Sequence, residues 1–237
     1  MISFSVMKLP TIKERKRFPS PAVTPQALAW NGEEFWMSSR DLGTLYKLDP
    51  PSLDAGPART SGAADKDEWK TVEEIDPPGV VWAAVATNGA MHFTIGKGLN
   101  DDRYVYRYDS TNGFAKVFAC PDFAGSYLSF DGKNLYLSQW YEKRILKYDA
   151  KGNVIRKIDI GAEICGHTFV DGIIYVLRGV EKPNEDWRIA RLDPREETPA
   201  VKDLAVVPFA CRSLTFDGQN FWSNYRAANE VISFSLP

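Results

Sequence analysis

The stretch SFDGKNLYLSQWYEKRILKYD, residues 129–149, carries the clearest β pattern of the chain. Its Asp131-Gly132 pair is a tight-turn signal, because glycine adopts a positive φ without steric cost. The apolar and aromatic run LYLS at 135–138 is typical of a strand. After polar residues at 141–143, the run ILKYD at 145–149 predicts a second strand with a charged side chain on its exposed face. The stretch therefore predicts at least two antiparallel strands.

The same pattern occurs five times along the chain. A turn glycine followed by an apolar or aromatic pair recurs at intervals of 57, 43, 40 and 46 residues, at Gly32, Gly89, Gly132, Gly172 and Gly218. Each turn is followed by a strand with a basic residue and a final aspartate: LYKLD at 45–49, VYRYD at 105–109, ILKYD at 145–149, IARLD at 189–193, and more weakly VISFS at 231–235. A repeat of this length with four strands is the signature of a β-propeller blade.

The number of strands predicts how the ring closes. Fourth strands are expected at 72–75, 114–119, 154–160 and 201–206, but the fifth copy ends at Pro237 after its third strand. By register, the missing outer strand falls near residues 13–18, in the segment KERKRF. We therefore predict an all-β fold, a five-bladed β-propeller with four antiparallel strands per blade, closed by strand exchange between the N- and C-terminal segments. Residues 1–237 are predicted to form one domain, with 50–68 as an inserted surface loop in blade 1.

Composition narrows the function classes. The chain has 237 residues and a net charge of −2, so no electrostatic attraction to nucleic acid or membrane is expected. No apolar run approaches the roughly 20 residues that span a bilayer. The three cysteines, an odd number, favour a reduced, cytoplasmic setting. A monomer without a metal or cofactor is expected.

Two of the cysteines, Cys165 and Cys211, occupy equivalent positions in neighbouring blades, seven residues before their turn glycines. A disulfide needs Cα atoms within about 7 Å. Inner strands of adjacent blades are usually farther apart, so two free buried thiols are expected.

The strand ends that meet at one face of the ring form the candidate site. If the register holds, the channel mouth on this face carries Gln26, Arg40, Lys97, Trp140, His167, Arg178, Arg212, Tyr225 and Arg226. Arginine and aromatic side chains together suit a small anionic or carboxylate-bearing ligand, and a protein partner is the other expectation. Arg212 is the most informative, because an arginine within an apolar inner strand requires a partner for its charge.

Simpler explanations exist for the same residues. Charged residues are common in turns and can pair with neighbouring acids. His167 could be a general base, but no carboxylate or second histidine shares its strand, so a hydrogen-bonded structural histidine is favoured.

A family resemblance rests on the blade units and on one local motif. The chain resembles the five-bladed glutamine cyclotransferase family and the wider YncE-like and NHL-type propellers. The run TPQAL at 24–28 is similar to that family's F-T-Q-G-L motif, which implies that Gln26 takes the place of a substrate-contacting glutamine. The family's acid–base glutamate lies in a G-E-G-L motif, but this chain has Ala83 at that position. The resemblance therefore implies the fold and argues against that activity.

Two functions remain open. The favoured one is a non-catalytic propeller that binds a ligand at the channel mouth. The alternative is an enzyme (a lyase, hydrolase or cyclotransferase-like protein) that uses His167 and a carboxylate from a loop, such as Asp101, Asp102 or Glu142.

Overall fold

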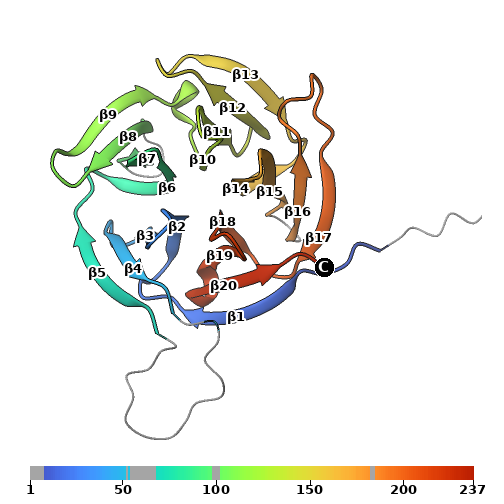
Figure 1. The fold of residues 1–237 in the computed structure, drawn as a ribbon, viewed down its shortest axis with the longest axis horizontal. Coiled ribbons are helices and arrows are strands. Elements are labelled where there is room, and N and C mark those ends of the chain that lie inside the picture. The colour runs from blue at the N-terminus through green and yellow to red at the C-terminus, as the bar shows by residue number, and fades with distance from the viewer. Residues whose placement is uncertain (1–7, 52, 54–67, 98–101, 182–184) are drawn as a thin grey trace, which may run out of the picture.

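Five four-stranded antiparallel sheets surround a central axis in the computed structural model, which describes residues 8–51, 53, 68–97, 102–181 and 185–237 (Figure 1). From the inner strand outward, blade 1 consists of β2 (Pro25–Trp30), β3 (Phe35–Ser39), β4 (Leu45–Asp49) and β5 (Lys70–Ile75), and blade 2 of β6 (Val80–Thr87), β7 (Ala90–Gly96), β8 (Tyr104–Asp109) and β9 (Gly113–Ala119). Blade 3 consists of β10 (Leu128–Phe130), β11 (Leu135–Gln139), β12 (Arg144–Tyr148) and β13 (Val154–Asp159), and blade 4 of β14 (Glu163–Val170), β15 (Ile173–Val180), β16 (Asp186–Leu192) and β17 (Lys202–Val207). Blade 5 consists of β18 (Cys211–Phe216), β19 (Phe221–Tyr225), β20 (Glu230–Ser235) and β1 (Lys13–Pro19). The predicted five-bladed propeller is confirmed.

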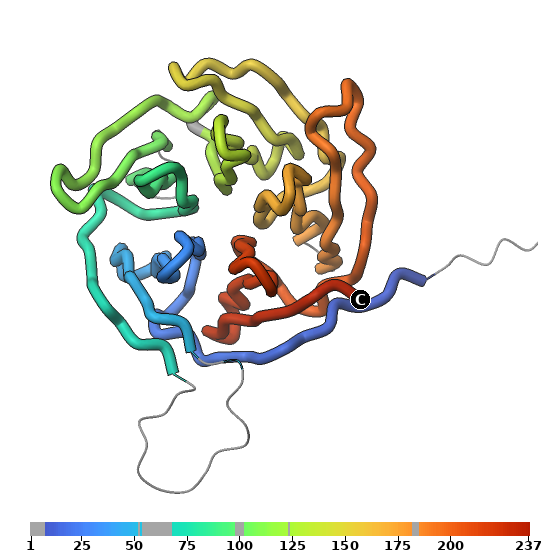
Figure 2. The backbone as a smooth tube through the Cα atoms, viewed as in Figure 1, coloured from blue at the N-terminus to red at the C-terminus, as the bar shows by residue number. Residues whose placement is uncertain are grey.

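The N-terminal strand closes the ring. β1 pairs antiparallel with β20, and Phe18 lies opposite Val231. Phe18 is 1% exposed and packs against Trp69 and Trp222, with ring centroids 6.0 and 5.9 Å away. The tube in Figure 2 shows the blue N-terminal strand running along the outside of the red C-terminal blade. The predicted strand exchange is therefore confirmed.

The repeated glycines provide the backbone geometry that the sequence suggested. Their φ angles lie between 78° and 106°, in the region that favours glycine, at Gly32, Gly89, Gly132, Gly172 and Gly218. Each joins an inner strand to the next strand of its blade. One short element thus defines the period of the whole ring.

The inner strands depart from regular alternation near their first residues. The pairing with the second strand shifts between Pro25 and Leu28 in blade 1, and between Val81 and Ala83 in blade 2. Equivalent shifts occur in β14 and β18. Because a bulge inserts an unpaired residue, it changes which side chains face the channel.

Blades 4 and 5 approach one another unusually closely at Gly166. A Cβ at Gly166 would lie 2.5 Å from the carbonyl carbon of Ser213 and 2.6 Å from the nitrogen of Leu214. The sulfur atoms of Cys165 and Cys211 consequently lie 3.0 Å apart. Both thiols are free and buried, as expected, and their side chains meet between the two strands.

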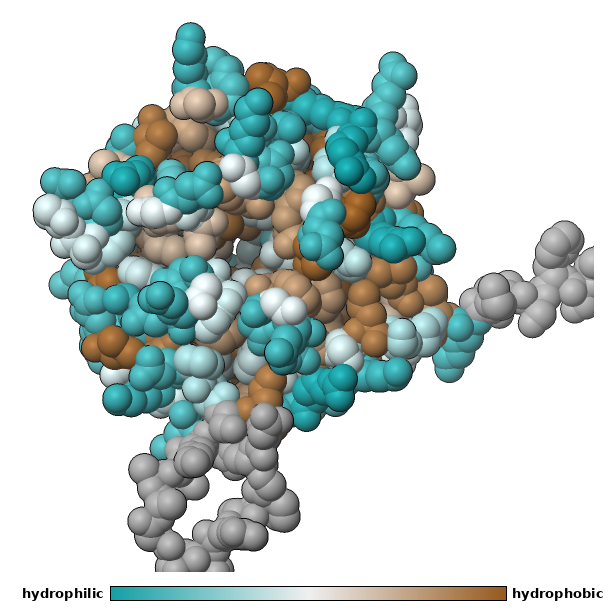
Figure 3. Space-filling model, in the orientation of Figure 1, coloured by the Kyte–Doolittle hydropathy of each residue, from teal (hydrophilic) through white to brown (hydrophobic). Residues whose placement is uncertain are grey.

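Little else of the described chain is regular. Its helical structure consists of two short 3-10 segments, Pro121–Phe123 and Arg226–Ala228, and none of its helices is long and apolar enough to cross a bilayer. The predicted insertion at 50–68 lies largely outside the described residues. In the view of Figure 3, apolar residues surround the central opening and hydrophilic residues occupy much of the perimeter.

Candidate functional site

A cavity of about 580 Å³ lies where the inner strands begin, within the size range of ligand sites. Its lining contains arginines, carboxylates and aromatic rings: Arg40, Arg103, Arg212, Arg226, Asp102, Asp122, Glu181, Trp82, Tyr127, Trp140 and Tyr141, together with Gln26, Ala124 and Ser126. Five of the nine predicted residues are in this set: Gln26, Arg40, Trp140, Arg212 and Arg226.

Arg212 forms an ion pair within the protein. Its Nη2 donates to Oε1 of Glu181, in the loop after β15, and its Nη1 donates to the Cys211 carbonyl at 2.7 Å. Its guanidinium also lies 5.2 Å from the ring centroid of Trp140 and 5.7 Å from that of Trp187. The carboxylate partner comes from a loop rather than from an inner strand. Arg212 therefore does not require a ligand to balance its charge.

Arg226 is different, because an amide rather than a carboxylate holds it. Its Nη1 donates to Oε1 of Gln26 at 2.6 Å. In the part of the chain that the structure describes, no carboxylate lies within ion-pair distance of Arg226. Burial, followed by repulsion from Arg212 and Arg40, lowers the pKa of Arg226 below its ordinary value. The cavity wall thus contains a partly buried cation that has no ion-pair partner among the described residues.

Gln26 is fixed from both ends of its amide. While Oε1 accepts from Arg226, Nε2 donates to the backbone carbonyl of Trp82 at 3.2 Å and to the Tyr127 hydroxyl at 3.4 Å. Burial raises the pKa of Tyr127 to about 12, so its hydroxyl stays protonated at neutral pH. The Tyr127 proton is therefore available to a ligand oxygen.

Trp82 forms an aromatic wall with two guanidinium groups beside it. The Arg103 group lies 4.0 Å from the ring centroid, and the Arg40 group lies 5.9 Å away. Arg103 also donates to the Gly125 carbonyl at 2.7 Å. Arg40 has no carboxylate within ion-pair distance among the described residues. Because repulsion from Arg40 contributes to the lowered pKa of Arg226, these two guanidinium groups lie near one another in the cavity wall.

Four predicted residues lie elsewhere. Arg178 donates to Asp203 of β17 at 2.8 Å and to the carbonyl of Ile160, in the connection from blade 3, at 2.8 Å. Tyr225 packs on Phe209, with ring centroids 5.7 Å apart. Lys97 is exposed and borders residues outside the described part.

His167 has a structural environment. It is 1% exposed; its Nε2 donates to the Tyr127 carbonyl at 3.1 Å, which leaves Nδ1 to accept from the Ser129 hydroxyl at 2.7 Å. Both ring nitrogens are therefore occupied within the protein, and His167 does not line the cavity.

Acid is expected to destabilise the fold through His167. Burial lowers its pKa to about 4, below the roughly 6.5 of an unfolded chain. The unfolded state then binds the proton first, so this stabilisation is complete above pH 6.5 and is lost as the pH falls towards 4. Melting temperatures of the wild type and a His167→Gln variant between pH 7 and 4 check this. The variant should show a shallower fall, and identical slopes would contradict the assignment.

Two residues of the cavity, Trp82 and Glu181, were not among the predicted site residues, and the structure shows why. Trp82 lies in the β6 bulge, so strict alternation does not predict that it lines the channel mouth. Glu181 lies in a loop, and it pairs with Arg212, which is 31 residues away in sequence, so no local pattern predicts this contact. Of these two, only Trp82 carried a local signal, as an aromatic residue directly before the position equivalent to Gln26.

Solved structures similar to this chain include enzymes and a structural complex. The Myxococcus xanthus glutaminyl cyclase is 12% identical with a TM-score of 0.60, over 96% of this chain and 98% of that one. A PQQ-bound aldose sugar dehydrogenase from Streptomyces coelicolor is 10% identical with a TM-score of 0.54, over 97% and 100%. A chain of a nidogen/laminin complex is 14% identical with a TM-score of 0.56, over 90% of this chain and 76% of that one. No protein-family model and no curated protein sequence matches the chain. These similarities show the propeller fold, which serves several functions.

Proposed function

We propose that this propeller binds a small ligand that carries a carboxylate or another negative group at the channel mouth. The observation that carries the proposal is Arg226, a partly buried cation with no carboxylate partner among the described residues. A partly buried cation of this kind is stabilised when an anion is bound. Arg40 adds a second charge on the same side.

The rest of the cavity suits the body of such a ligand. Trp82 and Trp140 offer flat apolar surfaces, and Tyr127 offers a hydroxyl proton. The carboxylates Asp102 and Asp122 lie exposed at the edge, and Asp122 is 3.9 Å from Arg144. The preferred ligand therefore has a negative group directed towards Arg226 and an apolar or aromatic body against the tryptophans.

Replacing Arg226 with glutamine is expected to weaken ligand binding while leaving the fold intact. A thermal-shift screen of carboxylic acids and phosphates, followed by titration of the compounds that stabilise the wild type, tests this. Loss of a charge-assisted hydrogen bond should weaken binding by about 10- to 100-fold in Arg226→Gln.

The matched control is Arg195→Gln, which removes the same charge from an exposed pair with Asp193. It should bind as the wild type does. Equal weakening in both variants, or none in Arg226→Gln, would contradict the proposal.

A catalytic role is the second candidate, and Glu181 favours it. Its carboxylate lines the cavity and is 34% exposed, so a bound molecule can reach it. His167 does not reach this cavity, so Glu181 would act without it. A Glu181→Gln variant that still binds ligand but no longer converts it would support catalysis.

Glutaminyl cyclotransferase activity is expected to be absent. Ala83 stands where the resembling family has its acid–base glutamate, and the cavity does not include Ala83. Incubation with peptides that begin with glutamine should give no pyroglutamate above the uncatalysed rate. Turnover that Gln26→Ala abolishes would refute this prediction.

A further inference from the structure

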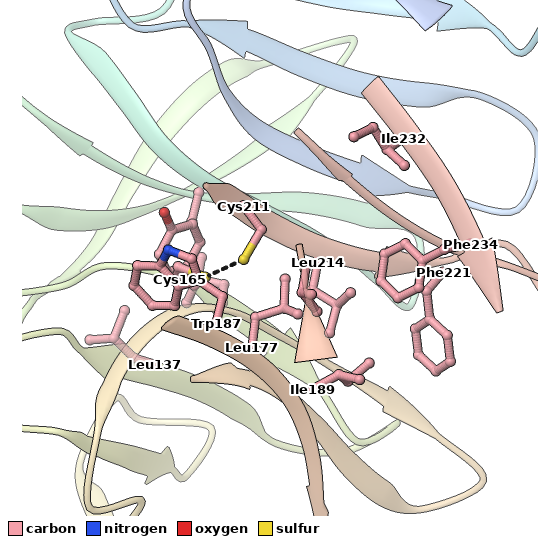
Figure 4. Close-up of a cluster of buried hydrophobic side chains, with 14 of the residues drawn as sticks. Leu137, Cys165, Leu177, Trp187, Ile189, Cys211, Leu214, Phe221, Ile232 and Phe234 are labelled. Atoms are coloured by element: carbon pink, nitrogen blue, oxygen red, sulfur yellow. Dashed lines mark hydrogen bonds between the residues drawn. The ribbon is translucent and has the colours of Figure 1, made fainter. Parts of the chain in front are cut away.

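The thiols of Cys165 and Cys211 meet between blades 4 and 5. The sulfur atoms of Cys165 and Cys211 are 3.0 Å apart, and both residues are 0% exposed (Figure 4). A disulfide bond is about 2.05 Å long, so a shift of about 1 Å would bring the sulfurs to bonding distance.

The backbone explains why these two strands meet. The residue after Cys165 is Gly166, and any Cβ there would collide with the backbone of Ser213 and Leu214. Inner strands β14 and β18 each carry their bulge at this level. The absence of a side chain and the matched bulges bring two equivalent positions of adjacent blades into contact.

The third cysteine provides an internal comparison. Cys120 follows β9 and is also buried, at 1% exposure. A Cβ on Gly125 would lie 2.4 Å from its sulfur, so Cys120 packs against a glycine rather than another thiol. Among three buried cysteines, the described structure brings only Cys165 and Cys211 together.

We propose that Cys165 and Cys211 form an intrachain disulfide when the chain folds in the presence of a disulfide oxidant such as oxidised glutathione. The thiolate of Cys211 attacks one sulfur of the oxidant and releases one glutathione thiolate. The thiolate of Cys165 then attacks the mixed disulfide and releases the second. Two protein thiols are oxidised, the glutathione disulfide is reduced to two thiols, and the two protons pass to solvent or to the released thiolates.

The location determines when this exchange occurs and what it does. Burial raises the pKa of Cys165 well above its ordinary value, and full burial excludes a bulky oxidant from the closed fold. The bond therefore forms before blades 4 and 5 pack, and the closed fold then protects it from reductants. It covalently joins two blades beside Arg212, whose Nη1 bonds the Cys211 carbonyl in the cavity wall.

Refolding of the full chain tests this inference. The protein is unfolded in guanidinium and refolded in mixtures of oxidised and reduced glutathione. It is then denatured in the presence of an alkylating agent, and its mass is measured by mass spectrometry. The expected product has one alkylated cysteine, Cys120, and a mass lower by two hydrogens before alkylation, with a linked Cys165–Cys211 peptide after digestion. Its melting temperature should exceed that of the reduced protein by about 5–10 °C.

Three variants sharpen the result. Cys120→Ser should keep the full temperature shift, whereas Cys165→Ser and Cys211→Ser should lose it. If a variant fails to fold, the alkylation pattern of the wild type decides alone. Three alkylated cysteines at every glutathione ratio, or a bond that involves Cys120, would overturn the proposal.

Discussion

Deletion of residues 1–20 is expected to abolish folded protein. β1 supplies the outer strand of blade 5, and without it β20 presents an unpaired edge. Exposed edges of this kind promote aggregation. The deletion also removes Phe18 from its contacts with Trp69 and Trp222. Expression followed by circular dichroism and thermal melting measures the loss, and an unchanged melting temperature would show that the ring closes in another way.

A single substitution in β1 measures how much the packing of the Phe18 side chain contributes to stability while the strand itself is kept. Phe18→Ala should lower the free energy of unfolding by about 3–5 kcal/mol, since the side chain is 1% exposed. Because the free energy of unfolding of natural domains is about 5–15 kcal/mol, this loss is a large fraction of the whole stability. Phe18→Leu retains most of the apolar volume and should cost much less. Equal losses in the two variants would mean that the aromatic cluster does not hold the strand.

Gly166→Ala is expected to destabilise the contact between blades 4 and 5 strongly for a change of one methyl group. The added Cβ would lie 2.5 Å from the carbonyl carbon of Ser213, a backbone atom that cannot rotate away. Blades 4 and 5 would have to separate, at a cost of about 3 kcal/mol. Denaturant unfolding followed by tryptophan fluorescence measures this cost.

The equivalent position in blade 3 provides the control. Ser126 lies six residues before its turn glycine, as Gly166 does, and its site already accommodates a side chain. Ser126→Ala should change stability by about 0.5 kcal/mol or less. Comparable losses at the two positions would contradict the close approach at Gly166.

The fold could be predicted because its determinants are local and repeated. A turn glycine with positive φ, followed by an aromatic or apolar strand, recurs five times, and a basic–aspartate strand follows in four of the five copies. Each copy therefore specifies a hairpin from residues close together in sequence. The missing fourth strand of blade 5 then required a partner from elsewhere in the chain. The number of strands alone therefore predicts an N-terminal outer strand for blade 5, and β1 occupies that position.

The site could be predicted only in part, because its contacts are non-local. Register placed Gln26, Arg212 and Arg226 at one mouth, where the cavity lies. It could not predict that Glu181 reaches Arg212, nor that the bulge in β6 exposes Trp82. It also placed His167 at the mouth, whereas His167 bonds Ser129 and the Tyr127 carbonyl away from the cavity. Strand alternation carries no information about bulges or about loops that fold back.

The most direct test of anion binding at the channel mouth compares an acid with its neutral amide. Calorimetry would measure each compound of such a pair, chosen from the screen, on the wild type and on Arg226→Gln. The acid should bind the wild type at least about tenfold more tightly than the amide, and this preference should disappear in Arg226→Gln. Equal affinities for acid and amide, or a preference that survives in Arg226→Gln, would contradict the proposal.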